Sequence, residues 1–198
     1  KYQLKPPVPF TPGMEVSGEV LSIGSEVTEF KIGDRVAGLS QLGGYSEYIV
    51  LNKNAVYKIP LEMNHDQACA LLCAYGTSHY ALKQRAQLKK GNTLVVLGAS
   101  GSTGVAAIQI GKTMGAKVIA ASSSIEKQQY TKGLGADITI GYNKIKDQLK
   151  DLTNNIGVDV IFDPVGGELF EESSRALSRY CLLYTSDAAD ESDRGVVG

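Results

Sequence analysis

The sequence predicts an α/β protein in which a small β-domain precedes a doubly wound parallel sheet. Residues 13–57 consist of short β-rich runs separated by turns that contain glycine and aspartate. Residues 94–104 then pass from an apolar run into a glycine-rich turn, and an amphipathic segment follows, which is the pattern of strand, tight turn and helix. The alternation of strand and helix continues to about residue 177 and indicates a parallel sheet with helical crossovers.

The overall composition is that of an ordinary globular protein. Of the 198 residues, 43% are hydrophobic and 21% are charged, and the formal net charge is −1. This balance offers no electrostatic surface for nucleic acid or an anionic membrane, and no apolar run approaches the ~18 residues of a membrane helix. The three cysteines, Cys69, Cys73 and Cys181, form no disulfide framework. We therefore expect a cytoplasmic protein with neither a nucleic-acid nor a membrane partner.

The first 60 residues are expected to form the β-domain. Residues 5–12 hold four of the six prolines and are expected to be extended. Three β-rich runs follow, each bounded by turn signals: Val16–Ile23, Arg35–Leu39 and Tyr45–Leu51. Their spacing predicts a small twisted or barrel-like β-domain.

Residues 61–90 change to a helical period and are expected to connect the two domains. Ala68, Leu71, Leu72 and Tyr75 fall on one helical face, and the helical pattern continues from Tyr80.

The cysteines and histidines of this connector are interpreted as structural residues. Cys69 and Cys73 lie one helical turn apart, a spacing that suggests metal, but their Ala and Leu neighbours favour small buried side chains and no second ligand pair follows. His65 and His79 are the only histidines. They are expected at the surface or at helix ends rather than as catalytic bases.

Residues 91–180 are expected to form a nucleotide-binding domain around the turn Gly98–Gly104. Glycine lets the backbone approach a pyrophosphate, and the helix that begins near Gly101 points its free N–H groups and positive dipole end at that anion. Ala99, Gly101 and Gly104 fit the dinucleotide fingerprint with Ala in place of the first Gly. The candidate cofactor-binding residues of the turn are Gly98, Ala99, Ser100, Gly101, Ser102, Thr103 and Gly104.

Two other interpretations of this turn are weaker. A glycine-rich turn that binds nothing is the simpler one, but a second apolar strand, Lys117–Ala121, follows the helix as a dinucleotide fold requires. Gly111-Lys112-Thr113 ends like a phosphate-binding P-loop. However, Ala106 stands where that motif needs glycine, and the segment lies inside the helix.

The later elements place further candidate residues beside the turn. The expected strands are 117–121, 137–142 and 158–163, and the expected helices are 125–133, 144–153 and 168–177. Ligands of a doubly wound sheet bind at the carboxyl ends of its strands. Ser122–Ser124, Tyr142 and Asp163–Gly166 are therefore expected on one rim with Gly98–Gly104.

The end of the second strand favours NADP over NAD. NAD-binding folds place a carboxylate about 20 residues after the motif, where it would repel a 2′-phosphate. This chain has Ser122, Ser123 and Ser124 there, followed by the positive charge of Lys127. Glu126 is the objection to this interpretation, unless it faces solvent from the following helix.

Five stretches together resemble one family: Pro9–Gly18, Phe30–Gly38, Gly43–Tyr48, Leu97–Gly104 and Asp163–Gly167. They resemble the medium-chain dehydrogenase/reductase superfamily, in particular its zinc-independent NADPH:quinone oxidoreductase branch. The resemblance implies a GroES-like β-domain followed by a Rossmann domain, with the active cleft between them. Chains of that family begin with more β-domain strands and end with more Rossmann strands, so the sequence is expected to be truncated at both ends.

The resemblance also implies that zinc is absent. Zinc-dependent relatives have His before the Glu of this segment, whereas Met14 precedes Glu15 here, and a thioether is a poor zinc ligand beside imidazole. The four-cysteine lobe of those relatives is missing, because Gly38–Tyr48 contains no cysteine.

The chemistry that the resemblance implies is hydride transfer from NADPH to a quinone or an activated alkene. Thr77 would lie near the nicotinamide, and Val165 and Gly166 beside the nicotinamide ribose. Ser122, Lys127 and Tyr142 would surround the 2′-phosphate. Tyr45 and Tyr75 are either cleft residues or, as we favour, packing aromatics, and no side chain is assigned as a general acid.

Two further interpretations remain open, an enoyl-thioester (2-enoyl-CoA) reductase of the same superfamily and a non-catalytic NADPH-binding protein. The family commonly pairs through late Rossmann strands, so the full-length protein is expected to be a homodimer.

The last residues differ in character from the rest of the chain. The segment that begins at Tyr184 resembles translated adapter sequence at the ends of environmental gene fragments. We hypothesise that residues 181–198 are a non-native tail, disordered or poorly packed.

Overall fold

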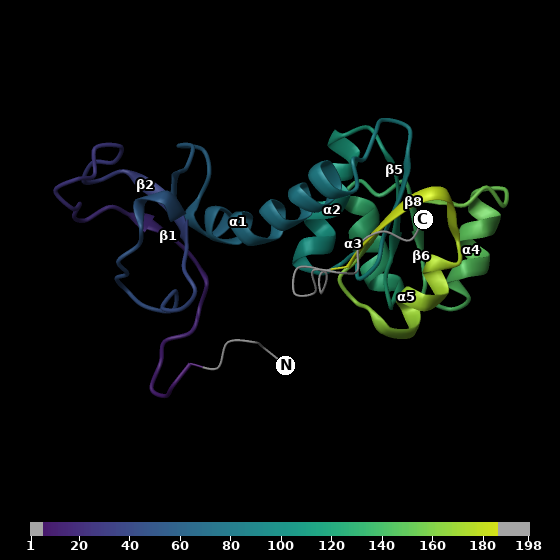
Figure 1. Cartoon of the computed structure of the whole chain (residues 1–198), viewed down its shortest axis with the longest axis horizontal. Coiled ribbons are helices and arrows are strands. Elements are labelled where there is room, and N and C mark those ends of the chain that lie inside the picture. Colours follow the sequence, from purple (N-terminus) through teal and green to yellow (C-terminus); the bar gives the residue numbers. More distant parts are fainter. Residues whose placement is uncertain (1–5, 186–198) are drawn as a thin grey trace. The chain divides into compact units, whose positions relative to one another are not determined.

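The structure is a computed structural model that describes residues 6–185, with side chains as far as Ser178 (Figure 1). It divides into two units, Lys1–Cys73 and Ala74–Gly198. The division falls within helix α1 (His65–His79), inside the segment predicted to connect the domains. The predicted limits of residues 1–60, 61–90, 91–180 and 181–198 stay predictions.

The first unit contains a three-stranded antiparallel sheet in the order β1-β2-β3. Its strands are β1 (Glu15–Glu19), β2 (Arg35–Leu39) and β3 (Val56–Lys58), and the short helix η1 (Lys53–Ala55) precedes β3. Glu15 pairs with Leu39 at one end of the β1/β2 ladder, and Glu19 pairs with Arg35 at the other. The prediction that the first part of the chain forms a small β-domain is confirmed.

The predicted strand Tyr45–Leu51 is wrong. This segment has no regular structure, and Tyr45, Tyr48 and Val50 are 79%, 74% and 98% exposed. Residues with high β-propensity form a strand only where a partner strand and a packed face receive them, and neither is present among the described residues. The first run was also predicted too long, since β1 ends at Glu19 rather than at Ile23.

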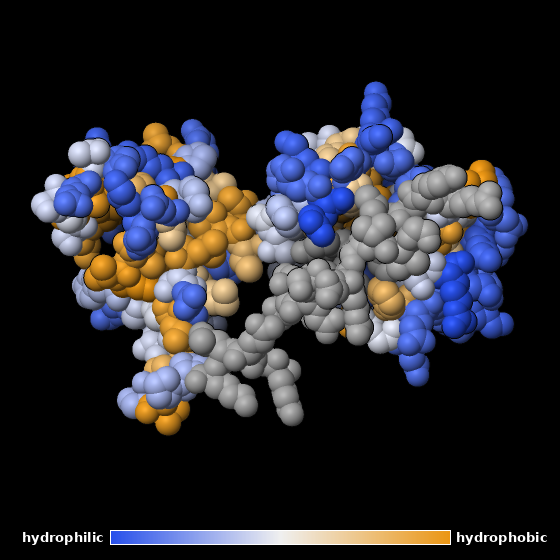
Figure 2. Space-filling view, in the orientation of Figure 1, coloured by the Kyte–Doolittle hydropathy of each residue, from blue (hydrophilic) through white to orange (hydrophobic). Residues whose placement is uncertain are grey.

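Apolar side chains are abundant on the surface of the first unit (Figure 2). Large exposed hydrophobic residues include Val8, Phe10, Met14, Leu21, Ile23, Ile32, Tyr57 and Leu61. The fully buried hydrophobic residues of this unit, within the described part of the chain, are Ala37 and Ala68.

The second unit contains a five-stranded parallel sheet in the order β6-β5-β4-β7-β8. The strands are β4 (Thr93–Val96), β5 (Lys117–Ala121), β6 (Ile138–Ile140), β7 (Val158–Asp163) and β8 (Leu177–Thr185). The helices are α2 (Ser102–Thr113), α3 (Ile125–Gly133), α4 (Ile145–Leu152) and α5 (Gly167–Ser174). The predicted helices and the four predicted strands are confirmed. The end of α5 is three residues earlier than predicted, because Leu177 already begins β8.

The sheet has an apolar core on each face, as its position between two layers of helices requires. On one face Leu94, Val96 and Phe162 pack with Leu82 and Ile108. On the other face Val95, Leu97 and Ile161 pack with the α4 residues Ile145 and Leu149, and the partly buried Leu169 of α5 joins them.

The connector continues past α1 as a π-helix, η2 (Tyr80–Arg85). Its wider turn is closed by the Ala86 N–H, which donates to the Ala81 carbonyl at 2.8 Å. The turn places Ala81 and Leu82 in the core of the sheet.

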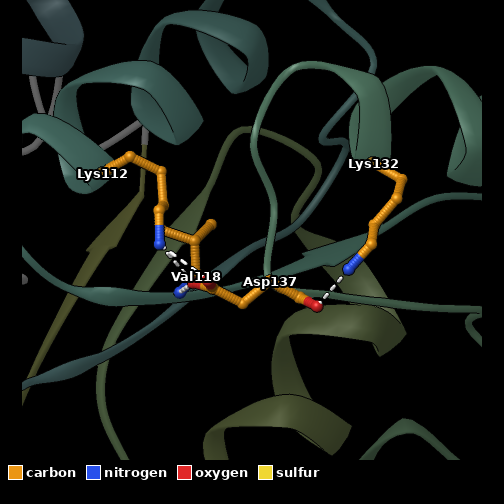
Figure 3. A network of polar contacts seen from close by, with 4 residues as sticks. All are labelled: Lys112, Val118, Lys132 and Asp137. Carbon is orange, nitrogen blue, oxygen red and sulfur yellow. Dashed lines mark hydrogen bonds and ion pairs between the residues drawn. The ribbon is translucent and has the colours of Figure 1, made fainter.

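The carboxylates of Asp137 and Asp159 accept hydrogen bonds from backbone N–H groups at the amino ends of β5 and β4. The Asp137 carboxylate receives the Lys112 ammonium at 2.7 and 2.8 Å and accepts from the Val118 N–H of β5 at 2.7 Å (Figure 3). The Lys132 ammonium donates to the Asp137 carbonyl from the other side (Figure 3). On β7, the Asp159 carboxylate accepts from the Thr93 N–H of β4 at 2.7 Å. These contacts lie at the edge of the sheet opposite to the predicted ligand rim.

The fifth strand reaches into the predicted tail. β8 pairs in parallel with β7 as far as Asp163 opposite Thr185, so the backbone of residues 181–185 belongs to the sheet. The rest of the predicted tail, residues 186–198, lies outside the described residues, and its non-native origin stays a hypothesis.

Candidate functional site

The chain reverses direction across the sheet at the boundary of β4 and β7. From β4 it winds outward through β5 to β6, and it then returns to place β7 on the other side of β4. Loops that follow neighbouring strands diverge at such a switch point and leave a crevice at the carboxyl edge, where doubly wound folds bind ligands. The crevice is flanked by the turn after β4, which begins at Gly98, and by the end of β7 at Asp163.

The last glycine of the turn Gly98–Gly104 packs against the backbone at the start of the same turn. The Gly101 N–H donates to the Gly98 carbonyl at 2.9 Å, and Gly101 is the N-cap of α2. A Cβ added to Gly104 would lie 2.6 Å from the Gly98 oxygen and 2.8 Å from Ala99 Cα, so only glycine fits there. The first N–H groups of α2 have no acceptor within the helix, and they provide an anion-binding N-terminus at the crevice.

Helix α1 is attached to the first turn of α2. The hydroxyl of Ser78, a fully buried residue, donates to the Thr103 carbonyl at 2.9 Å. The half-buried Thr77 precedes Ser78, so the structure brings it to the same end of α2 as the glycine turn. The Tyr75 hydroxyl donates to Gln109 Oε1 at 2.5 Å, which agrees with the packing role favoured for this tyrosine.

The serines after β5 form the next part of the rim. Ser122 is fully buried and its hydroxyl oxygen has no partner, although its N–H donates to the Ile140 carbonyl at 3.0 Å. Ser123 is exposed, and the Lys127 ammonium lies 3.4 Å from its hydroxyl. Ser124 caps α3 by accepting from the Lys127 N–H at 3.3 Å. Glu126 is exposed in the first turn of α3, so the carboxylate that argued against a phosphate faces solvent.

Tyr142 follows β6 and packs against the apolar core on one face of the sheet. Partial burial raises the pKa of its hydroxyl, the Gly98 backbone opposes this, and the negative charge of Asp163 adds to the rise. Because Tyr142 follows the carboxyl end of β6, it lies at the same edge of the sheet as the turns after β4 and β7.

Asp163 is the site residue whose role the sequence did not reveal. It is 1% exposed, and its Oδ1 accepts from the Val165 N–H at 2.7 Å and from the Gly166 N–H at 3.0 Å. Its Oδ2 has no partner. The sequence predicts that Asp163 lies on the ligand rim, but the holding of its own turn by its side chain was missed, although an Asp that precedes Pro-Val-Gly is a recognisable signal for this role.

These residues fit a dinucleotide that carries a 2′-phosphate. Gly104 lets the first turn of α2 lie directly against the end of β4, the buried Ser122 hydroxyl lacks a partner, and Lys127 brings a positive charge to the adjoining Ser123. The predicted cofactor residues of this unit therefore gather at one edge of one sheet.

Two side chains of the first unit that could ligate a metal, Glu15 and His65, have hydrogen-bond partners within the unit. The Glu15 carboxylate accepts from the Cys73 N–H at 2.9 Å, and the His65 Nδ1 lies 2.8 Å from the Ser17 hydroxyl, which itself donates to the Val36 carbonyl. Cys69 and Cys73 are half-buried rather than fully buried as expected. Burial raises the pKa of the Cys69 thiol, and the Glu15 and Asp66 carboxylates add to this.

The two histidines lie at the two ends of α1, as the sequence predicts. Over residues 6–178, whose side chains the structure describes, no group of three or more His, Cys, Asp or Glu side chains is arranged to hold a metal. Over the same range, no helix is long and apolar enough to cross a membrane.

Comparison with known families identifies both units. Residues 1–61 match the alcohol dehydrogenase GroES-like domain, and residues 102–180 match the zinc-binding dehydrogenase family. The chain therefore belongs to the medium-chain dehydrogenase/reductase superfamily, with a GroES-like sheet followed by a Rossmann-like sheet.

Comparison with individual relatives indicates to which family of the superfamily the chain belongs. The chain is 43% identical over 182 residues to the quinone oxidoreductase-like protein 2 homolog of Nematostella vectensis. The aligned region covers 90% of this chain and 50% of that protein. The Escherichia coli quinone oxidoreductase complexed with NADPH superimposes with a TM-score of 0.86 at 30% identity, over 91% of this chain and 56% of that one. Within the superfamily, the chain belongs to the quinone oxidoreductase family.

The coverage is partial, and neighbouring activities share the fold. The chain spans about half the length of the curated relatives that it matches. The CurK enoyl reductase superimposes with a TM-score of 0.84 at 26% identity, over 89% of this chain and 53% of that one.

Proposed function

We propose that the chain binds NADPH at the carboxyl edge of its five-stranded sheet, and that the protein transfers a hydride from NADPH to a quinone or another electron-poor acceptor without zinc. The observation that carries the proposal is the combination at this edge of the glycine turn with the unpartnered Ser122 hydroxyl and the Lys127 ammonium. The family supports the acceptor class, because the chain's relatives include quinone oxidoreductases.

Each part of the site has a defined task in this proposal. The N-terminus of α2 and the turn Gly98–Gly104 hold the pyrophosphate through backbone N–H groups and the helix dipole. Ser122, Ser123 and Lys127 hold the 2′-phosphate, and the hydroxyl of Tyr142 closes this side of the pocket. Thr77 and the turn at Val165 and Gly166 border the nicotinamide. When bound, NADPH supplies the hydride, and the protein supplies orientation and exclusion of water.

The proposed independence from zinc rests on the first unit. Met14 offers a thioether, which is a poor zinc ligand beside imidazole. Glu15 and His65 already have hydrogen-bond partners, and the raised pKa of Cys69 disfavours the thiolate that zinc requires.

A titration of the chain with NADPH and with NADH, followed by nicotinamide fluorescence, tests the cofactor assignment. A hydrogen-bonded charge contact is worth about 1.5–3 kcal/mol, so NADPH should bind roughly 10- to 100-fold more tightly than NADH. Lys127→Glu should abolish this preference. Lys117→Glu is the matched control, because Lys117 is an exposed lysine at the opposite end of β5. Equal binding of NADH, together with no effect of Lys127→Glu, would contradict the assignment.

The rate of NADPH oxidation with different acceptors distinguishes the proposed quinone reductase from an enoyl-thioester reductase and from a non-catalytic NADPH-binding protein. NADPH oxidation should be faster with 1,4-benzoquinone than with a 2-enoyl-CoA. The reverse preference would favour an enoyl-thioester reductase, and the CurK enoyl reductase has a similar fold. Tight NADPH binding without turnover of any acceptor by the full-length protein would favour a non-catalytic NADPH-binding protein.

A further inference from the structure

Asp163 holds the turn that follows β7 through one carboxylate oxygen. Oδ1 accepts two backbone hydrogen bonds, from Val165 at 2.7 Å and from Gly166 at 3.0 Å. The side chain is almost fully buried, so these bonds are shielded from water and resist exchange with solvent. Gly166, the second donor, has a φ of +73°, a conformation that L side chains rarely adopt, and the carboxylate stabilises it there.

The turn held by Asp163 touches the glycine turn across the crevice. A Cβ added to Gly98 would lie 2.8 Å from Val165 Cγ2 and 3.5 Å from Pro164 Cγ, so Val165 packs directly over Gly98. The position of Val165 therefore determines how closely the turn after β7 approaches the turn after β4. A displaced Val165 would alter this approach without any change in the glycine turn itself.

The Asp163 turn and the phosphate-binding serines lie on opposite sides of β4. Ser122 and Lys127 belong to the β5 side, while Asp163, Val165 and Gly166 belong to the β7 side. A dinucleotide whose pyrophosphate lies on the N-terminus of α2 spans both sides. With its 2′-phosphate end at β5, the nicotinamide end must lie toward β7.

We propose that Asp163 is a positioning residue that fixes the nicotinamide half of bound NADPH by holding Val165 and Gly166 against the crevice. The inference rests on the proposed cofactor site, and it adds a residue that acts through its turn rather than by touching the cofactor. The unpartnered Oδ2 takes no part in holding the turn, so an acceptor at the position of Oδ1 is sufficient.

Two variants distinguish the loss of the hydrogen-bond acceptor at Asp163 from the loss of its negative charge. Asp163→Ala removes the acceptor and should release Val165 and Gly166. Asp163→Asn retains an acceptor oxygen of the same shape and should rescue the turn. Asp159→Ala is the matched control, because Asp159 lies on the same strand and also accepts a backbone N–H, from Thr93 at 2.7 Å, but at the opposite edge of the sheet.

Binding of two probes to the 198-residue chain tests the proposal. NADPH spans both sides of β4, whereas adenosine 2′,5′-bisphosphate carries the 2′-phosphate half and lacks nicotinamide. Asp163→Ala should raise the Kd of NADPH roughly tenfold, the equivalent of one hydrogen bond to a charged group, and leave that of the bisphosphate within a factor of two. Asp163→Asn and Asp159→Ala should bind both probes as the wild-type chain does.

The outcomes distinguish this inference from the proposed function. If the wild-type chain binds neither probe, the cofactor site itself is wrong. If it binds both and Asp163→Ala binds NADPH normally, or loses both probes equally, Asp163 has no selective positioning role. Failure of Asp163→Asn to restore NADPH binding would also overturn the inference. Circular dichroism of each variant shows whether the sheet is folded. If Asp163→Ala is unfolded, the test falls to Asp163→Asn: wild-type binding of both probes supports an acceptor at Oδ1 as sufficient, and a loss of NADPH binding while Asp159→Ala binds normally overturns the inference.

Discussion

Gly104→Ala should destabilise the chain even though alanine is the better helix former. The added Cβ would meet the Gly98 oxygen at 2.6 Å and the Ala99 Cα and C atoms at 2.8 and 2.9 Å, and these are backbone atoms that no rotamer change can move. Ordinary contact begins near 3.4 Å, so α2 must retreat from β4. Overpacking of this kind costs about 1–3 kcal/mol, and helix propensity returns about 1 kcal/mol. The expected net loss is about 0–2 kcal/mol.

Thermal unfolding followed by far-UV circular dichroism measures this loss. At about 2–4 °C for each kcal/mol, the melting temperature should fall by up to about 8 °C. Gly76→Ala is the matched control, because Gly76 lies within α1 and its Cβ would meet nothing within 4 Å. That variant should gain up to about 1 kcal/mol. NADPH affinity of Gly104→Ala should also fall, because the N-terminus of α2 moves. An equal stabilisation in both variants would refute the close-approach argument.

Two further predictions concern polar contacts of the second unit. The pKa of Asp137 is lowered, since burial raises it but the hydrogen bonds from Lys112 and Val118 outweigh that effect. Its contribution to stability is therefore complete above the unfolded-state pKa near 3.9 and is lost as the pH falls through the lower folded-state pKa. Asp137→Asn should flatten the fall in melting temperature below pH 4, and an unchanged acid profile would count against this. Ser78→Ala removes the buried bond to Thr103 and should cost about 0.5–1.5 kcal/mol, whereas Ser174→Ala, at an exposed contact to Glu171, should leave the melting temperature unchanged.

The sequence predicts the parallel sheet well because its signals are local. Apolar runs such as Val158–Asp163 and caps such as Ser124 determine strands and helix starts within a few residues, and the glycine spacing marks the phosphate turn. The parallel direction of the strands and the handedness of the crossovers follow once these elements are known. The predicted cofactor residues from Gly98 to Gly166 accordingly fall at one edge.

The features that the sequence does not predict depend mainly on contacts between residues that are distant in the chain. Tyr45–Leu51 has the residue types of a strand, but pairing depends on a neighbour that the local sequence does not encode. The hydrogen bond from Ser78 to Thr103 joins residues 25 positions apart, and no periodicity marks it. The π-helical turn at Tyr80–Arg85 has the composition of an ordinary helix, so its wider geometry is visible only in the structure.

The carboxylates at the amino edge of the sheet have a consequence for how the site can change. Asp137 and Asp159 fasten β5 and β4 where these strands begin, 2.7 Å from the N–H groups of Val118 and Thr93. The turns at the other edge carry the proposed cofactor-binding residues and take no part in these bonds. Substitutions that alter cofactor preference at residues such as Ser123 and Lys127 therefore leave the anchorage of the strands intact. Substitutions at the carboxyl edge of the sheet can therefore change ligand specificity while the hydrogen bonds at the amino edge maintain the fold.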